Sequence, residues 1–399
     1  MKRSQFIKLS GTAIAGTALV PSLWSCSSIA QSQIKELEKH VIDRCELVEV
    51  DFRWSRFVGK NGRLDFHGQK HKNTLLKIYT NQGAMGWGLS DKKASEIIPL
   101  IKNKKVSDLI TPGNGIIETL DSRVDTALHD LMGVILNEPV YKLIGNKASN
   151  QVPIYSGMIY LDELNPGSET KGMDAILENC EWDYNYGYRQ LKVKIGRSGR
   201  WYPHQKGLEK DIEVVNLIHN TFKGRKTQIL VDANDMYSLE DTISFLKGIT
   251  DVPLYWMEEP FIEELDAGRK LKTWMNENGF ENTYYADGER KPNLDVCLQL
   301  GKEQVMDVLL ADVMGYGFSK WIKLMPQIKK MNMQASPHSW GSALKTNYNL
   351  HLAAGLGNVC TVEGVTCLSD DIDYGNYPII DGVVKVSDAP GFGMKILKK

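Results

Sequence analysis

Features that mark several other classes of protein are scarce or missing in this chain. Its 399 residues include only six cysteines, with no C-x-x-C pair or cysteine–histidine cluster, so neither a disulfide scaffold nor a zinc site is expected. Its 48 lysines and arginines against 49 acidic residues leave a net charge of −1, which excludes the basic surface that nucleic-acid binding needs. What remains is an average globular composition, 42% hydrophobic and 24% charged, in a chain long enough for two domains.

The first thirty residues differ from the rest of the chain. Three basic residues within the first eight precede a weakly apolar run over residues 9–24, and no acidic residue occurs before Glu36. This pattern is typical of an export signal, and the run is too short and too interrupted for a permanent transmembrane helix. K-R-S-Q-F-I-K resembles a twin-arginine signal, and L-W-S-C resembles a lipoprotein processing site at Cys26. We therefore expect residues 1–30 to act as an export signal that places the protein in the periplasm or, lipid-anchored through Cys26, at the cell envelope. Ordinary cleavage after Ala30 is the alternative.

Residues 31–150 predict a small α+β domain. Apolar and polar residues alternate over 47–52 and 75–79, which indicates strands, and N-Q-G at 81–83 indicates a turn. Apolar residues at helical spacing predict one helix over 123–145.

From residue 151 to residue 365 the pattern changes to short apolar runs that alternate with helical stretches. The runs are 152–158, 190–195, 228–231, 254–257, 283–286, 308–310, 333–335 and 359–362. This alternation predicts an α/β fold and favours a (β/α)8-type barrel, although a doubly wound open sheet would use the same units. The glycine pair at 355 and 357 precedes a run instead of following one, so it does not support a dinucleotide-binding turn.

Ionisable side chains follow most of these runs, roughly 25 to 40 residues apart, which is about one βα unit. They are Lys192 and Lys194, Asp232, Glu258, Glu289, Asp312, His338 and Glu363. Each alone has an ordinary explanation, such as a helix N-cap or a solvated strand end. Together they converge at the carboxyl-terminal face of a barrel, where unpaired charges would be costly to desolvate. Three carboxylates in succession need a cation between them, and hard oxygen ligands favour Mg²⁺.

These motifs resemble the enolase superfamily, in particular its mandelate racemase and muconate lactonizing enzyme subgroup. The matching segments are K-V-K (192–194), V-D-A-N (231–234), E-E-P (258–260), G-E (288–289), the Asp312 and His338 pair, Glu363, V-Y-K-L-I-G (140–145) and P-G-F-G-M-K-I (390–396). The resemblance implies a modified (β/α)8-type (TIM) barrel with an N-terminal α+β capping domain, to which residues 366–399 return. We also expect a homo-oligomer.

The resemblance implies a role for each matched position. Asp232, Glu258 and Glu289 would hold Mg²⁺, with Asn234 and Glu259 behind them. Lys194 would be one acid/base, made less basic by Lys192. His338, oriented by Asp312, would be the other acid/base, on the opposite face of the substrate, and Glu363 would hydrogen-bond the substrate carboxylate.

Elementary chemistry agrees with these roles. Removal of a proton α to a carboxylate adds negative charge to an oxygen pair that is already anionic, and a divalent cation stabilises that added charge. Two lysines two residues apart on one strand face the same side, so each is expected to lower the pKa of the other. An aspartate that accepts from one imidazole nitrogen fixes the tautomer of the other nitrogen.

Specificity is expected to come from a long basic loop over residues 53–72 and from the segment after Lys194. In the family this loop supplies a lid, and Arg53 and Arg56 lie in it, while Arg197, Trp201 and Tyr202 follow the lysine strand. Such basic groups would suit an anionic, polar substrate such as an acid sugar. His67 and His71 are expected to be loop residues and not metal ligands.

The sequence therefore predicts an enzyme that removes the proton α to a carboxylate, most simply to dehydrate an acid sugar. A racemase or epimerase of a hydroxy acid and a cycloisomerase are alternatives that use the same residues. An exported lipoprotein that binds a sugar acid without converting it is the non-enzymatic alternative.

Overall fold

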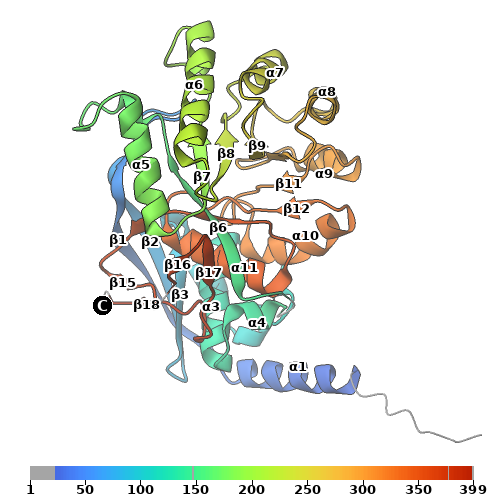
Figure 1. The fold of residues 1–399 in the computed structure, drawn as a ribbon. Helices are drawn as coiled ribbons and strands as arrows, with labels where there is room; N and C mark the ends of the chain where they lie inside the picture. Colours follow the sequence, from blue (N-terminus) through green and yellow to red (C-terminus); the bar gives the residue numbers. More distant parts are fainter. Residues whose placement is uncertain (1–22, 146–147, 376, 398–399) are drawn as a thin grey trace, which may run out of the picture.

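A parallel strand series and an antiparallel cap sheet make up the computed structural model, which describes residues 23–145, 148–375 and 377–397 (Figure 1). The chain starts with α1 (Leu23–Glu38), whose Leu37 packs into the core of the cap. No helix within the described ranges is long and apolar enough to cross a membrane.

The cap sheet is an antiparallel meander of β1 (Ile42–Val58), β2 (Gly68–Thr80) and β3 (Met85–Ser90). The predicted turn at 81–83 joins β2 to β3, with Gly83 at a φ of 80°. Helix α3 (Asp125–Leu136) lies across this sheet. A side chain at Gly86 would overlap the backbone of Leu131, so glycine allows this close approach.

The single helix predicted over 123–145 is wrong. The chain forms α3, then a break, and then the short α4 (Val140–Ile144). Asn137 adopts the left-handed conformation with a φ of 51°, and Pro139 precedes α4. Apolar spacing continued through this break because both helices bury apolar side chains, those of α3 in the cap core and those of α4 mostly in the larger cluster.

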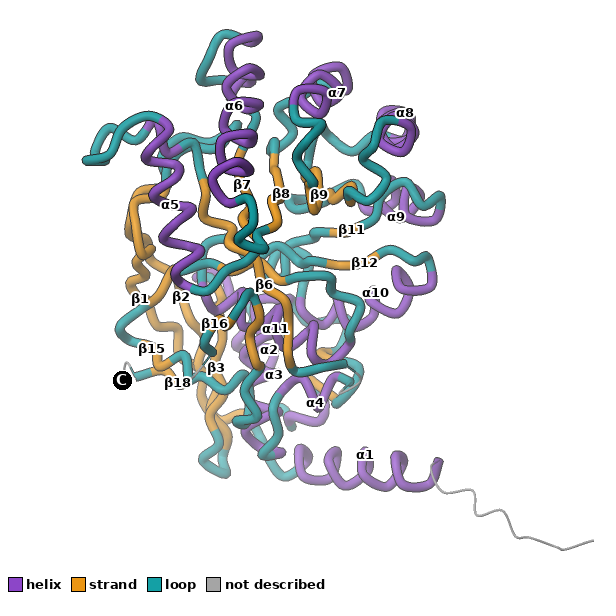
Figure 2. The backbone as a smooth tube through the Cα atoms, viewed as in Figure 1, coloured by secondary structure: helices purple, strands orange, loops and turns teal. Residues whose placement is uncertain are grey.

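The larger part of the molecule is a mixed α/β domain built on a series of neighbouring parallel strands (Figure 2). The strands are β6 (Gln151–Ile159), β7 (Gln190–Lys194), β8 (Gln228–Asp232), β9 (Leu254–Glu258), β10 (Tyr284–Asp287), β11 (Val308–Leu309), β12 (Gln334–Ala335) and β13 (Val362–Gly364). Each strand from β6 to β12 pairs with the next, and β13 pairs with β6. A single parallel bridge between Ala335 and Val359 joins the β12 end to the segment before β13.

Helices cover the outside of this strand series (Figures 1 and 2). They are α5 (Met173–Tyr186), α6 (His204–Phe222), α7 (Leu239–Gly248), α8 (Leu265–Glu277), α9 (Leu294–Lys302), α10 (Phe318–Lys330) and α11 (Ala343–Leu356). The predicted runs match the strands closely except the last, because Val359 makes only an isolated bridge and β13 begins three residues later.

Alternation within the strands separates two kinds of core. Val231 and Met257 belong to the large cluster that packs under the helices, while Leu230 and Trp256 belong to a separate cluster on the other side of their strands. Because side chains alternate, Asp232 shares the side of Leu230. In β8 and β9 an apolar residue, Leu230 or Trp256, therefore lies below the carboxylate at the end of the strand.

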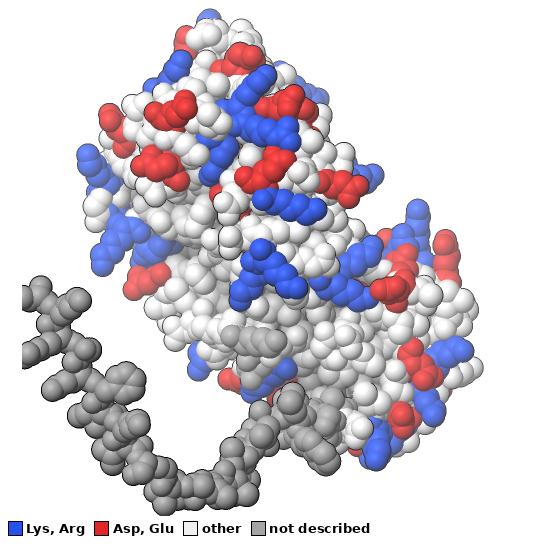
Figure 3. Space-filling model, turned by 90° about the vertical axis from the view of Figure 1, so that its right-hand side faces the viewer, with Lys and Arg blue, Asp and Glu red and all other residues white. Residues whose placement is uncertain are grey.

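Residues after β13 return to the cap. β14 (Cys367–Leu368) pairs with β1, and β17 (Val383–Lys385) pairs with the first half of β6. The remaining short elements are α2 (Ile98–Ile101), β4 (Ile110–Thr111), β5 (Gly115–Ile116), β15 (Ile372–Asp373), β16 (Ile379–Ile380) and β18 (Lys395–Ile396). Figure 3 shows acidic and basic side chains interspersed over one face, as the balanced composition predicts.

A buried carboxylate on α3 fastens this returning segment. Asp130 accepts from the backbone N–H of Phe392 at 2.9 Å through one oxygen and from the backbone N–H of Trp87 in β3 at 3.0 Å through the other. The C-terminal segment and the cap sheet thus meet at one side chain.

We predict that Asp130→Ala lowers the free energy of unfolding by about 2–4 kcal/mol, because it leaves two buried N–H groups without an acceptor. Urea denaturation followed by tryptophan fluorescence measures the change. Asp251→Ala, at an exposed turn, is the matched control and should stay within about 0.5 kcal/mol of the wild type. Equal stability of the two variants would contradict this role of Asp130.

Candidate active site

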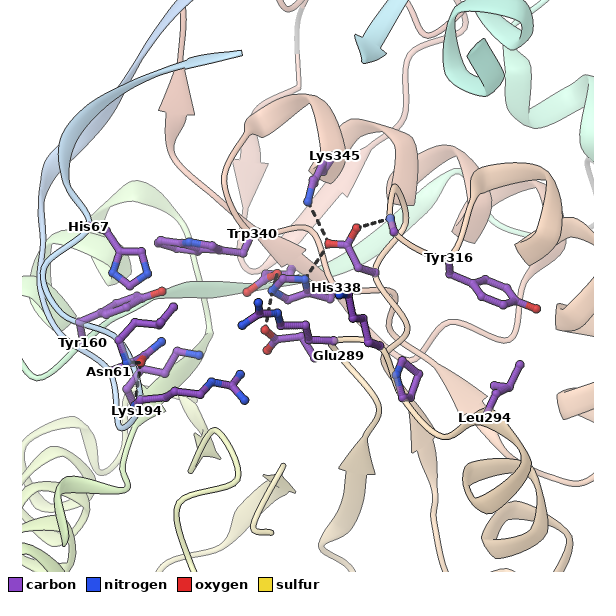
Figure 4. A pocket seen from close by; sticks show the side chains of 18 residues that line it. Asn61, His67, Tyr160, Lys194, Glu289, Leu294, Tyr316, His338, Trp340 and Lys345 are labelled. Carbon is purple, nitrogen blue, oxygen red and sulfur yellow. Dashed lines mark hydrogen bonds and ion pairs between the residues drawn. The ribbon is translucent and has the colours of Figure 1, made fainter. Parts of the chain in front are cut away.

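A cavity of about 740 Å³ is lined by five of the eight predicted charged residues. The carboxyl-terminal ends of the parallel strands and the residues that follow them supply Lys194, Glu289, Asp312, His338 and Glu363, and the loop between β1 and β2 supplies the wall over them (Figure 4). The remaining lining residues are Asn61, Arg63, Leu64, His67, Tyr160, Arg290, Lys291, Pro292, Leu294, Gly315, Tyr316, Trp340 and Lys345.

Three carboxylates from consecutive strands form a group that could hold a metal ion. Oxygens of Asp232, Glu258 and Glu289 lie within 4.8 Å of one another, and all three residues are buried. One oxygen of Glu258 and one of Glu289 have no hydrogen-bond partner in the described chain. Burial and the charge of Asp232 raise the pKa of Glu258 well above its usual range. Buried, unpartnered carboxylate oxygens in this number fit a hard divalent cation such as Mg²⁺.

Two lysines on β7 bring positive charge to this group. The ammonium nitrogen of Lys192 lies 2.8 Å from Glu258, 3.3 Å from Glu363 and 3.4 Å from Asp232. Lys194 donates to Asp232. Both lysines are buried, so their partners replace the water that they lose.

The carboxylates of the chain oppose the expected lowering of the pKa of Lys194. Burial and the neighbouring Lys192 do lower it, but the adjacent Asp232, with Glu289 and Glu258, outweighs both and raises the pKa above its usual value. The sequence prediction counted the like charge beside Lys194 and omitted the carboxylates that the fold brings to it.

His338 and Asp312 meet at the other side of the carboxylate group. His338 Nδ1 donates to Asp312 Oδ2 at 2.8 Å, and Nε2 lies 3.3 Å from Glu289. Lys345 donates to the same oxygen of Asp312 at 2.9 Å. Burial alone would lower the pKa of His338, but Glu289, Glu363 and Asp312 raise it. The imidazole is therefore held in one orientation with Nε2 directed at the carboxylates.

Glu363 lies between the two sets of groups. Its Oε2 accepts from the backbone N–H of Ser339 at 2.8 Å, and its Oε1 lies 3.3 Å from Lys192. Burial would raise the pKa of Glu363, but Lys192 and His338 lower it below the usual value. Glu363 can donate a hydrogen bond to a substrate only when its carboxyl is protonated, and Lys192 favours the ionised form. The predicted role of Glu363 therefore stays a prediction.

The two residues predicted to lie behind the metal-binding carboxylates each hydrogen-bond one of the three residues that carry them. The backbone N–H of Asn234 donates to Asp232 at 2.9 Å, and Glu259 accepts from the backbone N–H of Glu289 at 3.0 Å. Asn234 and Glu259 have φ values of 48° and 40°, a strained region for residues with side chains. This strain is tolerated where the backbone itself orients the carboxylates.

Two predicted substrate-binding arginines serve other purposes. Arg56 forms a paired contact with Asp183 at 2.7 and 2.9 Å. Arg197 is fully buried and donates to Glu163 and Asp211, each at 2.7 Å. Both guanidinium groups are thus paired with carboxylates from other elements, and neither lines the cavity in the described structure.

Arg53, Trp201 and Tyr202 also lie off the described cavity wall. Arg53 lines a separate groove beside the cap sheet. Tyr202 donates to Glu163 at 3.3 Å. Trp201 donates through its indole N–H to the carbonyl of Asn61 at 2.6 Å, so it supports the lid from behind. Trp201 and Tyr202 belong to the segment after Lys194, which turns outward and holds the loop, whereas Arg53 lies in β1.

Sequence reasoning missed several lining residues, among them Tyr160, Trp340 and Lys345. Trp340 follows His338 by two residues, and this proximity was the one signal that could have identified it. Tyr160 and Lys345 gave no signal, because nothing in their local sequence distinguishes them from core or surface residues.

A cluster of three carboxylates between a lysine and a histidine, at the ends of parallel strands, is typical of metal-dependent enzymes that transfer protons. The relatives of this chain specify the family. Residues 175–399, more than half of the chain, match the family model of the enolase C-terminal domain-like proteins. The chain therefore belongs to the enolase superfamily, with relatives and structural neighbours of the mandelate racemase and muconate lactonizing enzyme type. It is an enzyme of lyase or isomerase type, as those relatives are dehydratases, racemases and cycloisomerases.

Three relatives illustrate the similarity. An arabinonate dehydratase of Saccharolobus solfataricus is 27% identical over 76% of this chain and 77% of its own length. A galacturonate dehydratase structure from Geobacillus sp., solved with Mg, has a TM-score of 0.84 and 28% identity and covers 90% of this chain and 94% of that chain. A mandelate racemase/muconate lactonizing protein from Geobacillus sp. Y412MC10, complexed with magnesium and tartrate, has a TM-score of 0.83 and 27% identity and covers 90% and 93% of the two chains. These neighbours imply an α/β barrel with an N-terminal capping domain.

We predict that Asp232→Asn, Glu258→Gln and Glu289→Gln each weaken Mg²⁺ binding by at least about tenfold, because each removes one charge from the carboxylate group. Isothermal titration with MgCl₂ measures the affinity. Glu277→Gln, an exposed residue at the end of α8, is the matched control and should bind Mg²⁺ as the wild type does. Unchanged affinity in all three variants would place the metal elsewhere.

Proposed function

We propose that this enzyme dehydrates an acid sugar by removing the proton α to its carboxylate and expelling the β-hydroxyl as water. One observation supports this proposal most strongly. Two side chains able to exchange protons line one cavity at opposite ends of the cluster of three carboxylates. Lys194 contacts Asp232 at one end, and His338 contacts Glu289 at the other. A substrate held between them would present its reacting carbons to both. Relatives named as arabinonate, xylonate and galacturonate dehydratases favour the same reaction.

Asp232, Glu258 and Glu289 would hold Mg²⁺. When bound there, the ion stabilises the negative charge that grows on the substrate carboxylate as the α-proton leaves.

The amine of Lys194 would accept the α-proton, for which it must first lose its own proton. Lys192 would keep its charge, because it lies against Glu258 and Glu363, and would add positive potential beside the reacting carboxylate.

His338 would complete the elimination. Its Nε2–H would donate to the β-hydroxyl as the carbon–oxygen bond breaks, while Asp312 holds Nδ1 and stabilises the protonated ring. The proton goes to the leaving oxygen, water departs, and the electron pair of the α C–H bond forms a double bond between the two carbons. The resulting enol then rearranges to a 2-keto-3-deoxy acid.

Racemisation or epimerisation is the second candidate, supported by the same placement of Lys194 and His338. Two acid/base groups on two sides of one carbon could remove a proton from one face and return it to the other. A cycloisomerase would use these groups as well.

We predict that Lys194→Met abolishes exchange of the α-proton with deuterated solvent, because its side chain cannot accept a proton. We predict that His338→Asn lowers water elimination by at least about 100-fold but leaves exchange detectable. Proton NMR in D₂O with Mg²⁺ and a panel of acid sugars measures both. For a racemase, His338→Asn would instead exchange one enantiomer without inverting it. Exchange and turnover retained in both variants would refute this assignment of acid and base.

We also propose finer features of the fold and of the assembly. The strand series would be a closed, modified (β/α)8 barrel over residues 151–365, capped by residues 31–150, with residues 366–399 returning to that cap. The pairing of β14 with β1 and the bridge between Ala335 and Val359 support this division. The protein would assemble into a homo-oligomer.

Export is a separate proposal that rests on the sequence of residues 1–30. Most of this segment lies outside the described residues, which begin at Leu23. The mature protein would be periplasmic or lipid-anchored through Cys26.

We predict that mass spectrometry of native protein shows a chain without residues 9–24. A Cys26→Ala variant tests the lipid anchor. If the lipid is attached to Cys26, the variant loses membrane association. An intact Met1 on the native protein would overturn export, whereas unchanged membrane association of the variant would overturn lipidation alone.

A further inference from the structure

His67 reaches the reaction cavity from the cap. It belongs to the loop between β1 and β2 and lines the cavity together with Lys194 and Glu289. Figure 4 shows its ring beside Tyr160 and Trp340, on the side of the cavity away from Tyr316 and Leu294. The mechanism above gives this imidazole no task.

Hydrogen bonding fixes the tautomer of His67. Its Nδ1 lies 3.0 Å from the backbone carbonyl of Gly59, which can only accept, so Nδ1 bears the hydrogen. Burial lowers the pKa of His67, which favours the neutral ring. The other ring nitrogen, Nε2, then carries a lone pair, and no described residue donates to it.

Packing holds the ring in place. Tyr160 and Trp340 contact it edge to face, with ring centroids 5.2 and 5.6 Å away. The backbone N–H of His67 donates to Val58 at 3.1 Å. The ring therefore presents its lone pair in a defined direction before any substrate arrives.

The loop itself is fastened to the barrel. The backbone N–H of Leu161 donates to Lys60 at 2.9 Å, and Trp201 donates to the carbonyl of Asn61. Asn61 in turn accepts from the backbone N–H groups of Arg63 and Leu64 at 3.0 and 2.6 Å. These bonds connect the position of His67 to the strand ends that hold the acid/base groups.

We propose that His67 is a specificity-determining residue whose Nε2 accepts a hydrogen bond from a hydroxyl of the acid sugar, on a carbon beyond the two that react. This inference rests on the function proposed above. Of the carboxylates that line the cavity, Asp312 is engaged with His338 and Lys345, Glu363 accepts from Ser339, and Glu289 would hold the metal ion. The neutral Nε2 of His67 lies apart from them and can only accept a hydrogen bond. A substrate hydroxyl that loses its water on binding needs such an acceptor for its hydrogen.

Side-chain geometry offers a sharp test. In His67→Asn the amide nitrogen can take the place of Nδ1 and keep the bond to Gly59, but nothing replaces Nε2. In His67→Gln the amide oxygen can reach the place of Nε2. His71→Asn is the matched control, because His71 lies on β2 and contacts Asn73 instead of the cavity.

The experiment measures kcat and KM for the best acid sugar of a panel and for derivatives of it that lack one hydroxyl each beyond the reacting carbons. We expect His67→Asn to lose about 10- to 100-fold in kcat/KM with the full acid, mainly through KM. With one of the deoxy acids, His67→Asn should equal the wild type, because the hydroxyl that His67 would bind is absent. His67→Gln should recover part of the loss, and His71→Asn should show none.

Two results would overturn the inference alone: kcat/KM of His67→Asn within about twofold of the wild type, or an equal loss with the full acid and with every deoxy acid. Circular dichroism checks that each variant folds. If His67→Asn does not fold, His67→Gln is compared with the wild type: a partly reduced preference for the full acid over one deoxy acid supports the inference, and an unchanged preference opposes it. If the wild type converts no acid sugar at all, the proposed function fails and the inference with it.

Discussion

Buried negative charge is the constraint on which the rest of this structure depends. Oxygens of Asp232, Glu258 and Glu289 lie within 4.8 Å of one another in largely buried residues, a placement that the chain can tolerate only with positive charge nearby. Lys192 and Lys194 on the neighbouring strand supply part of it. Consecutive parallel strands are a direct means of delivering these five side chains to one point, because each strand ends at the same face and contributes one or two of them. The apolar floor around Trp256 keeps the group dry from below.

Chemistry and recognition are supplied by different parts of the chain. The strand ends provide every group to which a proton transfer is assigned, while the loop between β1 and β2 provides the wall that the far end of a substrate would meet. Lys60 and Asn61 join this wall to the barrel through backbone atoms. Changes of side chain in the loop can therefore alter which acid fits while the reacting groups stay in place. This separation agrees with the range of acid sugars named among the relatives.

The sequence was informative where function depends on position along the chain and uninformative where it depends on a distant partner. Asp232, Glu258 and Glu289 could be located because each follows an apolar run at the spacing of one βα unit. Arg56 and Arg197 could not be assigned, since their carboxylate partners come from other elements and only the fold brings them together. The break between α3 and α4 was hidden for a similar reason: apolar spacing persists across Asn137, and only its left-handed backbone ends the helix. The raised pKa of Lys194 likewise depends on neighbours from other strands.

The return of the C-terminal segment to the cap determines the order in which the two parts of the protein can be completed during synthesis. β14 adds the last strand to a sheet whose other strands lie within the first ninety residues. Asp130 accepts a hydrogen bond from the N–H of Phe392, which is synthesised 262 residues later. A ribosome releases the chain from its amino end, so the barrel strands can pair while the cap is still incomplete. Closing so long a loop costs entropy that only the finished chain can offset. The domain that is synthesised first is thus the one completed last.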